Sequence, residues 1–310
     1  MKKLTRIFSL AAAMLVASCS FAPVAAQTLK VATGGAKLTY STLYKEMVNA
    51  CGNEVAMVEI NSNGSMDNVD RLIGNEVNAA FVQSDVLYLR AKNEELGNLK
   101  TLLALHNEQI HIVAPVNSGI KVGGVMGMGS KEVVLTDLTS LAGLKIGASG
   151  GSAITAKVIR MNSEITYNVV EFATNDLVVA AIKSGEVSAG LIVGGAPVKL
   201  ITDLGPNFKL LPITGPIAER LKHVYRPARL NYSKLNAAGI TTVSTDALLV
   251  TREYKTAKMI DSLASFRGCV IGKIDEMKEA TGTHPAWQAV DPANKGKWAW
   301  YDLPAKAAKK

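Results

Sequence analysis

The sequence predicts an α/β fold in which two lobes, joined by two crossings of the chain, close on each other as a clamshell. The first observation is a short strand that runs into a glycine loop at 29–35 and again at 144–151. The second is a longer repeat, at 69–82 and 179–192, of a helix, a Glu-Val turn and a strand. The third is composition, since 48% hydrophobic and 19% charged residues exclude a disordered chain.

The first 26 residues have the pattern of a signal peptide that is removed after export. Lys2, Lys3 and Arg6 precede an apolar run at 7–17 that is too short to span a bilayer. Small residues at 24–26 then form a cleavage site, which would leave Gln27 as the new N-terminus. A second cut stays open, because 16–19 resembles a bacterial lipobox that would make Cys19 a lipid anchor. We therefore expect a periplasmic protein that is either free or tethered.

The order of the predicted elements divides the chain into two lobes. In the first repeat, the glycine loop is followed by a helix at 40–50 and a strand at 55–60. In the second repeat, the glycine loop is followed by a helix at 153–161 and a strand at 167–172. Further strands are expected at 102–105, 109–114 and 241–251, and helices at 254–268 and 273–280. Lobe one then comprises 27–115 and 241–310, and lobe two comprises 116–240. Ligand sites of open α/β sheets lie at the carboxyl ends of strands, which here are the two glycine loops.

Charge and cysteine content narrow the function classes. The formal net charge is +8, and the signal peptide carries part of it. The chain has no Lys/Arg run flanked by aromatic residues, so the sequence does not indicate a nucleic-acid-binding protein. Beyond the leader, no segment offers about 18 uninterrupted apolar residues. Cys51 and Cys269 are expected to form a disulfide within lobe one, the other reading being two separate buried thiols.

Several short motifs resemble one known family in their order and spacing. They are Thr33-Gly34-Gly35, the segments 63–68 and 81–85, and the shorter matches at 110–113, 147–152, 195–197 and 284–286. Together they resemble the TAXI solute-binding proteins of TRAP transporters over nearly the whole mature chain. The resemblance implies a monomeric, non-enzymatic periplasmic binding protein of the two-lobed, type II-like clamshell class. Such a receptor captures a small carboxylate, either an amino acid or a dicarboxylate such as glutamate, and delivers it to the membrane subunit of a TRAP permease.

The expected ligand-binding site joins the glycine loops to the helix N-termini beside them, because unpaired N–H groups there attract carboxylates. Gln83 and Ser84 are expected to contact the ligand, whereas Asp85 either captures an amino group or caps the next helix. Ser65 matches a family Gly-Ser turn and either caps its helix or donates to the ligand, and Tyr40 matches a tyrosine that lines the family's pocket. The predicted set is Thr33, Gly34, Gly35, Tyr40, Asn63, Ser65, Gln83, Ser84, Asp85, Gly150, Gly151 and Ser152.

Two other functions remain open at this stage. An extracytoplasmic sensor that presents its closed form to a membrane signalling partner would have the same sequence features. A secreted esterase is a remote alternative, since 147–151 matches G-x-S-x-G with Ser149 as nucleophile, and Asp203 and His223 follow it. The four histidines show no metal-ligand spacing, so neither a metal nor a cofactor is expected. Departures from the family pattern at 36–41 and 151–153, and a Gly/Met-rich insertion at 122–131, leave the ligand undefined.

Overall fold

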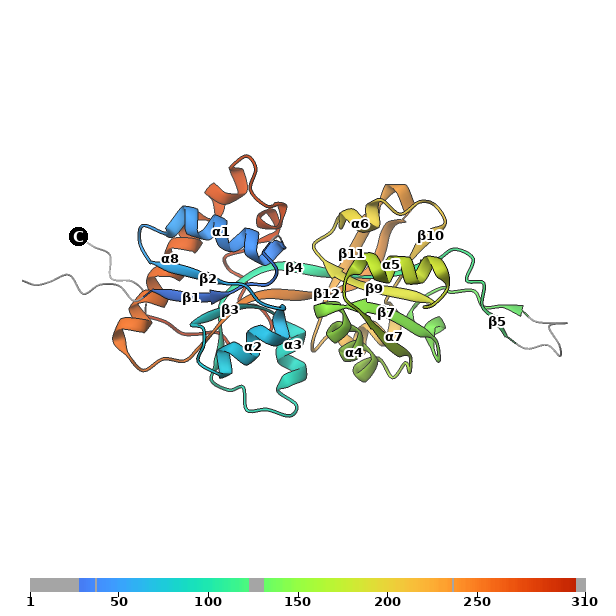
Figure 1. Cartoon of the computed structure of the whole chain (residues 1–310), viewed down its shortest axis with the longest axis horizontal. Helices are drawn as coiled ribbons and strands as arrows, with labels where there is room; N and C mark the ends of the chain where they lie inside the picture. The colour runs from blue at the N-terminus through green and yellow to red at the C-terminus, as the bar shows by residue number, and fades with distance from the viewer. Residues whose placement is uncertain (1–27, 37, 123–130, 236, 305–310) are drawn as a thin grey trace, which may run out of the picture.

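The computed structural model describes residues 28–36, 38–122, 131–235 and 237–304. These residues form two lobes that are joined by two long strands (Figure 1). The predicted signal peptide 1–26, with its alternative lipid site at Cys19, and most of the 122–131 insertion lie outside the described residues. Within the described ranges, no helix has both the length and the apolar character that crossing a bilayer requires.

The two lobes repeat one arrangement of parallel strands. Lobe one contains β1 (Leu29–Ala32), α1 (Thr39–Cys51), β2 (Met57–Ile60), α2 (Ser65–Ile73) and β3 (Ala79–Gln83). Lobe two contains β7 (Lys145–Ser149), α4 (Gly150–Ser163), β8 (Asn168–Phe172), α5 (Asn175–Ser184) and β9 (Ala189–Gly194). The strand orders are β2-β1-β3 and β8-β7-β9, and every one of these pairings is parallel. The repeat read from the sequence is therefore confirmed as two equivalent α/β units.

Two long antiparallel strands, β4 (Leu99–Pro115) and β12 (Ala237–Arg252), run from one lobe into the other (Figure 1). β12 pairs with β3 of lobe one through 247–251, whereas β4 pairs with β9 of lobe two through 109–113. The strands expected at 102–105 and 109–114 are therefore one strand, and that prediction was wrong. From these pairings we propose that the chain changes lobe inside the two strands, at 105–109 and 244–247, and not at 115/116 and 240/241.

The strands of both lobes belong to one ten-stranded sheet, whose main path has the order β2-β1-β3-β12-β4-β9-β7-β8. The other elements extend, cover or flank this sheet. They are α3 (Ser84–Arg90), β5 (Lys121–Val122), β6 (Lys131–Glu132), η1 (Leu138–Leu141), α6 (Lys199–Thr202), β10 (Phe208–Leu211), α7 (Gly215–Leu221), β11 (Arg226–Tyr232), η2 (Ser233–Leu235), α8 (Ala257–Glu279) and η3 (Pro285–Ala289). β10 pairs with β4 and β11 pairs with β12, both antiparallel. β5 and β6 pair with each other at the base of the 122–131 insertion.

The helix α8 is continuous, whereas the sequence predicted two helices at 254–268 and 273–280. Gly268 and Gly272 lie inside it, although glycine lowers helix propensity. Phe266, Val270 and Ile274 are spaced one turn apart and are all buried in the core of lobe one. Tertiary packing of this face therefore sustains the helix across its two glycines.

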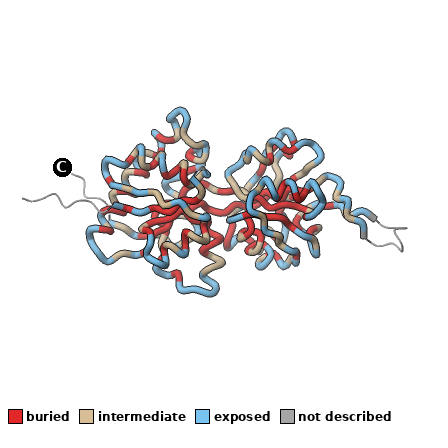
Figure 2. Tube along the Cα trace, in the orientation of Figure 1, coloured by how far each residue is buried: buried red, intermediate tan, exposed pale blue. Residues whose placement is uncertain are grey.

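Each lobe has its own hydrophobic core, which follows the central strands (Figure 2). In lobe one, α1 and α8 pack against the sheet, and Trp287 of η3 is fully buried beside them. In lobe two, α4 and α7 contribute the buried Ile159 and Leu221 to the core that contains Leu191 of β9. On the other face of lobe two, α5 lies close to the strands because β7 and β9 carry glycines there.

Replacing Gly190 of β9 with alanine is expected to destabilise lobe two by about 1–3 kcal/mol, the usual effect of overpacking. A Cβ at Gly190 would lie 2.7 Å from both Ile182 Cδ1 and Val178 Cγ1 of α5, so these side chains, or the helix that carries them, would have to shift. Chemical denaturation of the purified protein measures the change. Gly205→Ala is the control, because a Cβ there meets nothing within 4 Å. Equal midpoints for the two variants would contradict this account of the α5 packing.

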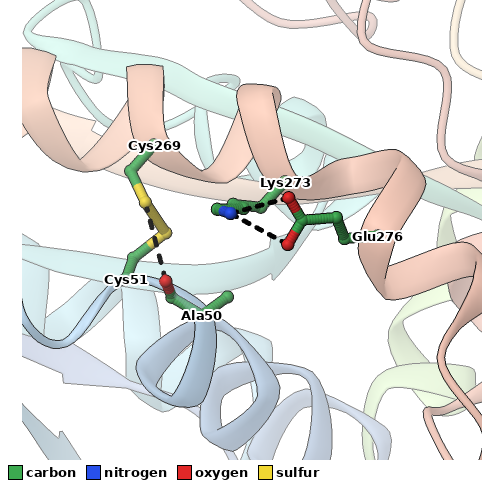
Figure 3. Close-up of a disulfide and its surroundings, with 5 residues drawn as sticks. All are labelled: Ala50, Cys51, Cys269, Lys273 and Glu276. Atoms are coloured by element: carbon green, nitrogen blue, oxygen red, sulfur yellow. Dashed lines mark hydrogen bonds and ion pairs between the residues drawn. A yellow bond between two sulfur atoms is a disulfide. The ribbon is translucent and has the colours of Figure 1, made fainter.

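A disulfide between Cys51 and Cys269 confirms the predicted pairing (Figure 3). The two Cα atoms lie 6.0 Å apart, and the bond joins the last residue of α1 to the middle of α8 across 218 positions of sequence. Because α1 opens lobe one and α8 closes it, the bond fixes the two chain segments of this lobe to each other.

Candidate ligand-binding site

The carboxyl ends of the parallel strands in the two lobes meet at the junction between the lobes. A Cβ placed on Gly151 at the start of α4 would lie 2.1 Å from Oε1 of Gln83, the last residue of β3. Helix α3, which continues from Gln83, also packs against α4 of lobe two. The second glycine loop and the end of β3 therefore face each other, as the clamshell interpretation requires. We call this region the inter-lobe site.

In lobe one, the predicted residues of the first glycine loop are held by the neighbouring strand and loop. Thr33 Oγ1 donates to Glu59 Oε1 at 2.9 Å, and Gly34 accepts hydrogen bonds from the Ser62 main chain and the Asn61 side chain. The carbonyl of Gly35 accepts from Leu38 N–H. These contacts fix the shape of the loop at the carboxyl end of β1, beside the start of α2.

Ser65 is the first residue of α2 and does not cap it, because Gly64 occupies the cap position with a φ of 93°. The Ser65 side chain is 5% exposed, and its Oγ accepts a hydrogen bond from Gln83 N–H at 3.1 Å. The capping interpretation of Ser65 was therefore wrong. Asn63 is exposed, and its N–H donates to Asp67 Oδ2 in the first turn of α2. Ser65 thus ties the start of α2 to the end of β3.

Three consecutive predicted residues leave β3 and enter α3. Gln83 is 6% exposed and reaches toward lobe two, as described above. Ser84 Oγ shares a hydrogen bond with Thr245 Oγ1 at 3.0 Å and accepts another from Asp246 N–H. The Ser84 hydroxyl is therefore bonded to β12, whereas Gln83 Oε1 lies against lobe two.

Asp85 is fully buried and connects the two lobes. Its Oδ2 accepts hydrogen bonds from Thr155 Oγ1 of α4 at 2.6 Å and from Tyr225 OH at 3.0 Å, both in lobe two. Its Oδ1 has no hydrogen-bond partner among the described residues. Burial raises the pKa of Asp85, the hydroxyls of Thr155, Tyr225 and Thr245 act in the opposite direction, and the charge of Glu108 raises it further.

In lobe two, the predicted anion cradle opens α4. Gly150 adopts a positive φ of 49° and is exposed, so it makes the turn from β7 into the helix. Ser152 is buried, and its Oγ accepts a hydrogen bond from Val193 N–H of β9 at 3.0 Å. Ser149 Oγ donates to Asn175 Oδ1 at 2.6 Å. The two serines brace the loop, while the main chain of Gly150 and Gly151 forms its surface.

Tyr40 of α1 lies on the lobe-one side of the junction and stacks on Phe81 with ring centroids 5.1 Å apart. Its hydroxyl donates to Glu108 Oε2 at 3.2 Å. Burial and the charge of Glu108 raise the pKa of Tyr40 well above its ordinary value. His106 Nε2 lies 3.5 Å from the other oxygen of Glu108. The predicted pocket tyrosine is thus part of a polar cluster on β4.

Five residues that complete this region were not predicted from the sequence: Glu108, His106, Thr155, Tyr225 and Thr245. One signal was present: polar residues at 106–109 interrupt an otherwise apolar strand where it passes between the lobes. Two surface hollows of about 320 and 760 Å³ lie beside α7 on lobe two, and none of the predicted site residues lines either of them.

The residues of the esterase alternative are not brought together. Ser149 bonds to Asn175, whereas His223 bonds to Tyr88 OH and the carbonyl of Arg220. Asp203 pairs with Lys199 on the exposed surface of α6. No hydrogen bond among the described residues links these three groups as a catalytic triad requires.

Two α/β lobes with facing strand ends, joined by two long strands, form a two-lobed clamshell fold. The family model described as the NMT1-like family matches residues 31–263. The chain belongs to this family, which consists of periplasmic solute-binding proteins.

Solved structures also resemble the chain. The amino acid ABC transporter substrate-binding protein AbpA from Streptococcus pneumoniae, bound to L-arginine, is 13% identical with a TM-score of 0.48, over 84% of this chain and 95% of that one. A single-residue mutant of ArgBP from T. maritima, bound to arginine, is 12% identical with a TM-score of 0.47. The match covers 78% of this chain and 94% of that one. Protein AF1704 from Archaeoglobus fulgidus is 12% identical with a TM-score of 0.49, over 87% and 90%.

Proposed function

We propose that this protein is a periplasmic receptor that captures a small carboxylate between its lobes and delivers it to a TRAP-type membrane permease. The observation that carries the proposal is the approach of Gln83 in lobe one to Gly151 in lobe two. That approach brings the strand end beside α2 close to the N-terminus of α4. Both helices have at least nine residues, and their first N–H groups are suited to a carboxylate.

Closure of the lobes supplies the mechanism. The carboxylate binds to the lobe-one edge formed by Thr33, Gly35, Ser65 and Gln83, and lobe two then adds the main chain of Gly150 and Gly151. Only ligand contacts that are stronger in the closed state shift the equilibrium toward it. The hinge is the pair β4 and β12, whose register shifts between Asp246 and Leu248 absorb changes in dihedral angle. No covalent bond is made or broken.

Delivery to a TRAP permease rests on the resemblance of the motifs at 33–35, 63–68 and 81–85 to TAXI proteins. Uptake of the radiolabelled ligand by spheroplasts supplied with the purified protein tests this step. TRAP-type transport is expected to depend on an ion gradient and to persist when ATP is depleted. Uptake that requires ATP and survives collapse of the gradient would contradict a TRAP partner.

Replacing Gln83 with alanine is expected to weaken ligand binding by about 1–3 kcal/mol, the usual effect of leaving a buried polar partner unpaired. A thermal-shift screen of the mature protein against amino acids and dicarboxylates first identifies a ligand, because binding to the folded state raises the melting temperature. Isothermal titration calorimetry then compares wild type with the variant.

Gln288→Ala is the matched control for that comparison, since Gln288 is an exposed residue of η3 that bonds only to the Lys278 carbonyl among the contacts described. Its affinity should equal that of wild type. Unchanged affinity in both Gln83→Ala and Ser65→Ala would exclude the inter-lobe site as the place of binding.

A further inference from the structure

Two carboxylates, Asp85 of α3 and Glu108 of β4, lie buried where the lobes meet, and we call them the acidic pair. Glu108 is 8% exposed and Asp85 is fully buried. Thr245 of β12 connects their positions, since it is the register partner of Glu108 and its Oγ1 accepts from Asp85 N–H at 3.4 Å. Residues directly opposite in an antiparallel pair project to one face. Glu108 and Thr245 therefore share one face of the β4–β12 ribbon, and the contact with Thr245 places Asp85 of α3 beside that ribbon.

The contacts of the acidic pair leave its charge largely uncompensated. Hydroxyl groups of Thr155, Tyr225 and Tyr40 donate to the two carboxylates, and each of these groups is neutral. The imidazole of His106 lies beside them, with Nε2 3.5 Å from Glu108 Oε1. Five buried side-chain atoms have no hydrogen-bond partner among the described residues, and two of them, Oδ1 of Asp85 and Nδ1 of His106, belong to this cluster. A buried, unpaired carboxylate oxygen is strongly unfavourable.

A third buried carboxylate near the acidic pair, Asp246, differs from it in having an arginine partner. Asp246 follows Thr245 in β12 and is 2% exposed. Its Oδ1 lies 2.8 Å from Nε of Arg226, and its Oδ2 accepts from Lys297 N–H at 2.8 Å. The charge of Asp246 is thus compensated by the guanidinium of Arg226. Within the described part of the chain, no lysine or arginine forms an ion pair with the acidic pair.

We propose that the acidic pair is a subsite for a cationic group of the ligand, placed beside the helix N-termini that bind its carboxylate. The proposal rests on the proposed function, because it assumes a ligand between the lobes, and it selects among ligand classes. A zwitterion with an ammonium group satisfies both halves of the site, whereas a dicarboxylate brings a second negative charge to Asp85 and Glu108. The ammonium group would donate to Asp85 Oδ1 and to Glu108.

The test is calorimetry on the mature, disulfide-bonded protein with pairs of compounds that differ only in the α-amine. The pairs are L-glutamate with glutarate, L-aspartate with succinate, and L-valine with isovalerate. In wild type, the amine-bearing member of a pair that binds is expected to bind about ten- to a hundredfold more tightly, as for a charge-assisted hydrogen bond. Glu108→Gln and Asp85→Asn should each remove most of that preference, and their melting curves report whether they fold.

Glu171→Gln is the control, because Glu171 is an exposed carboxylate of lobe two that pairs with Lys157. It should keep the wild-type preference. Equal or tighter binding of the deaminated member in wild type overturns the cationic subsite while the receptor function stands. An amine preference that persists in Glu108→Gln and Asp85→Asn overturns its assignment to these residues. Absence of binding by every member of every pair contradicts the proposed function itself, and the subsite with it.

Discussion

Replacing both Cys51 and Cys269 with serine should lower the free energy of unfolding by roughly 5 kcal/mol in the chain-entropy model. The size follows from the sequence separation of 218, because the bond removes the conformational freedom of a very long loop from the unfolded chain. The loop contains all of lobe two and both crossings. Denaturant titration of wild type and the double variant measures the difference. The fold itself should persist, since α1 and α8 also share buried contacts through Met47 and Phe266.

A reduced sample of wild type is the control for that comparison, and its denaturation midpoint should match that of the double serine variant. Ligand affinity should change little, because the bond lies within lobe one and outside the inter-lobe site. A loss below about 1 kcal/mol would show that the reduced, unfolded chain retains structure around α1 and α8, and would contradict the entropic account.

The two-lobed architecture could be predicted because the sequence pattern of one lobe occurs twice in the chain. Residues 29–35 and 144–151 end in glycine loops, and the segments 69–82 and 179–192 repeat helix, turn and strand. Local patterns of this kind depend on neighbours in sequence, so they survive without knowledge of the tertiary structure. The Cys51–Cys269 pairing was predicted differently, from two cysteines remaining in an exported chain, and the assignment of both residues to lobe one agreed with it.

Features set by tertiary packing were harder to predict. The single strand β4 contains polar residues at 106–109 that mimic a break, yet pairing with β12 and β9 keeps it extended. Helix α8 continues through Gly268 and Gly272 because its buried face packs on lobe one. In both cases the local sequence favours the end of a strand or helix, and contacts with residues distant in the chain keep the element continuous.

Individual roles at the inter-lobe site could not be predicted for a related reason. Ser65 was expected to cap its helix or donate to the ligand, and Ser84 and Ser152 to contact the ligand. Each hydroxyl accepts a main-chain hydrogen bond from a neighbouring strand. A serine at the edge of a sheet has the same sequence signature in either role. Asp85 had two predicted roles, and its contacts to Thr155 and Tyr225 across the junction could not be read from residues so distant in the chain.

Replacing Asp85 with asparagine is expected to stabilise the ligand-free protein by on the order of 1–3 kcal/mol at neutral pH, although Asp85 makes two inter-lobe hydrogen bonds. Asparagine keeps an oxygen that can accept from Thr155 and Tyr225, and it removes the buried charge. Circular-dichroism melts of both proteins measure the difference. Tyr225→Phe is the matched control, because it removes the hydroxyl that donates to the Asp85 carboxylate. This variant should lower the stability of the ligand-free protein.

The pH dependence gives the same prediction a second readout. The pKa of Asp85 is raised in the folded protein by burial and by Glu108, so the folded state binds a proton more tightly than the unfolded chain. The resulting stability is present at about pH 4 and below, near the ordinary pKa of aspartate, and is lost as pH rises through the raised value. The stability difference between Asp85→Asn and wild type should therefore grow as the pH rises from about 4 through the raised pKa of Asp85. A constant difference between the two proteins would show that Asp85 stays charged throughout. In the proposed cationic subsite the buried charge of Asp85 serves ligand binding at a cost in stability. A variant that gains stability while losing the amine preference would demonstrate that trade-off directly.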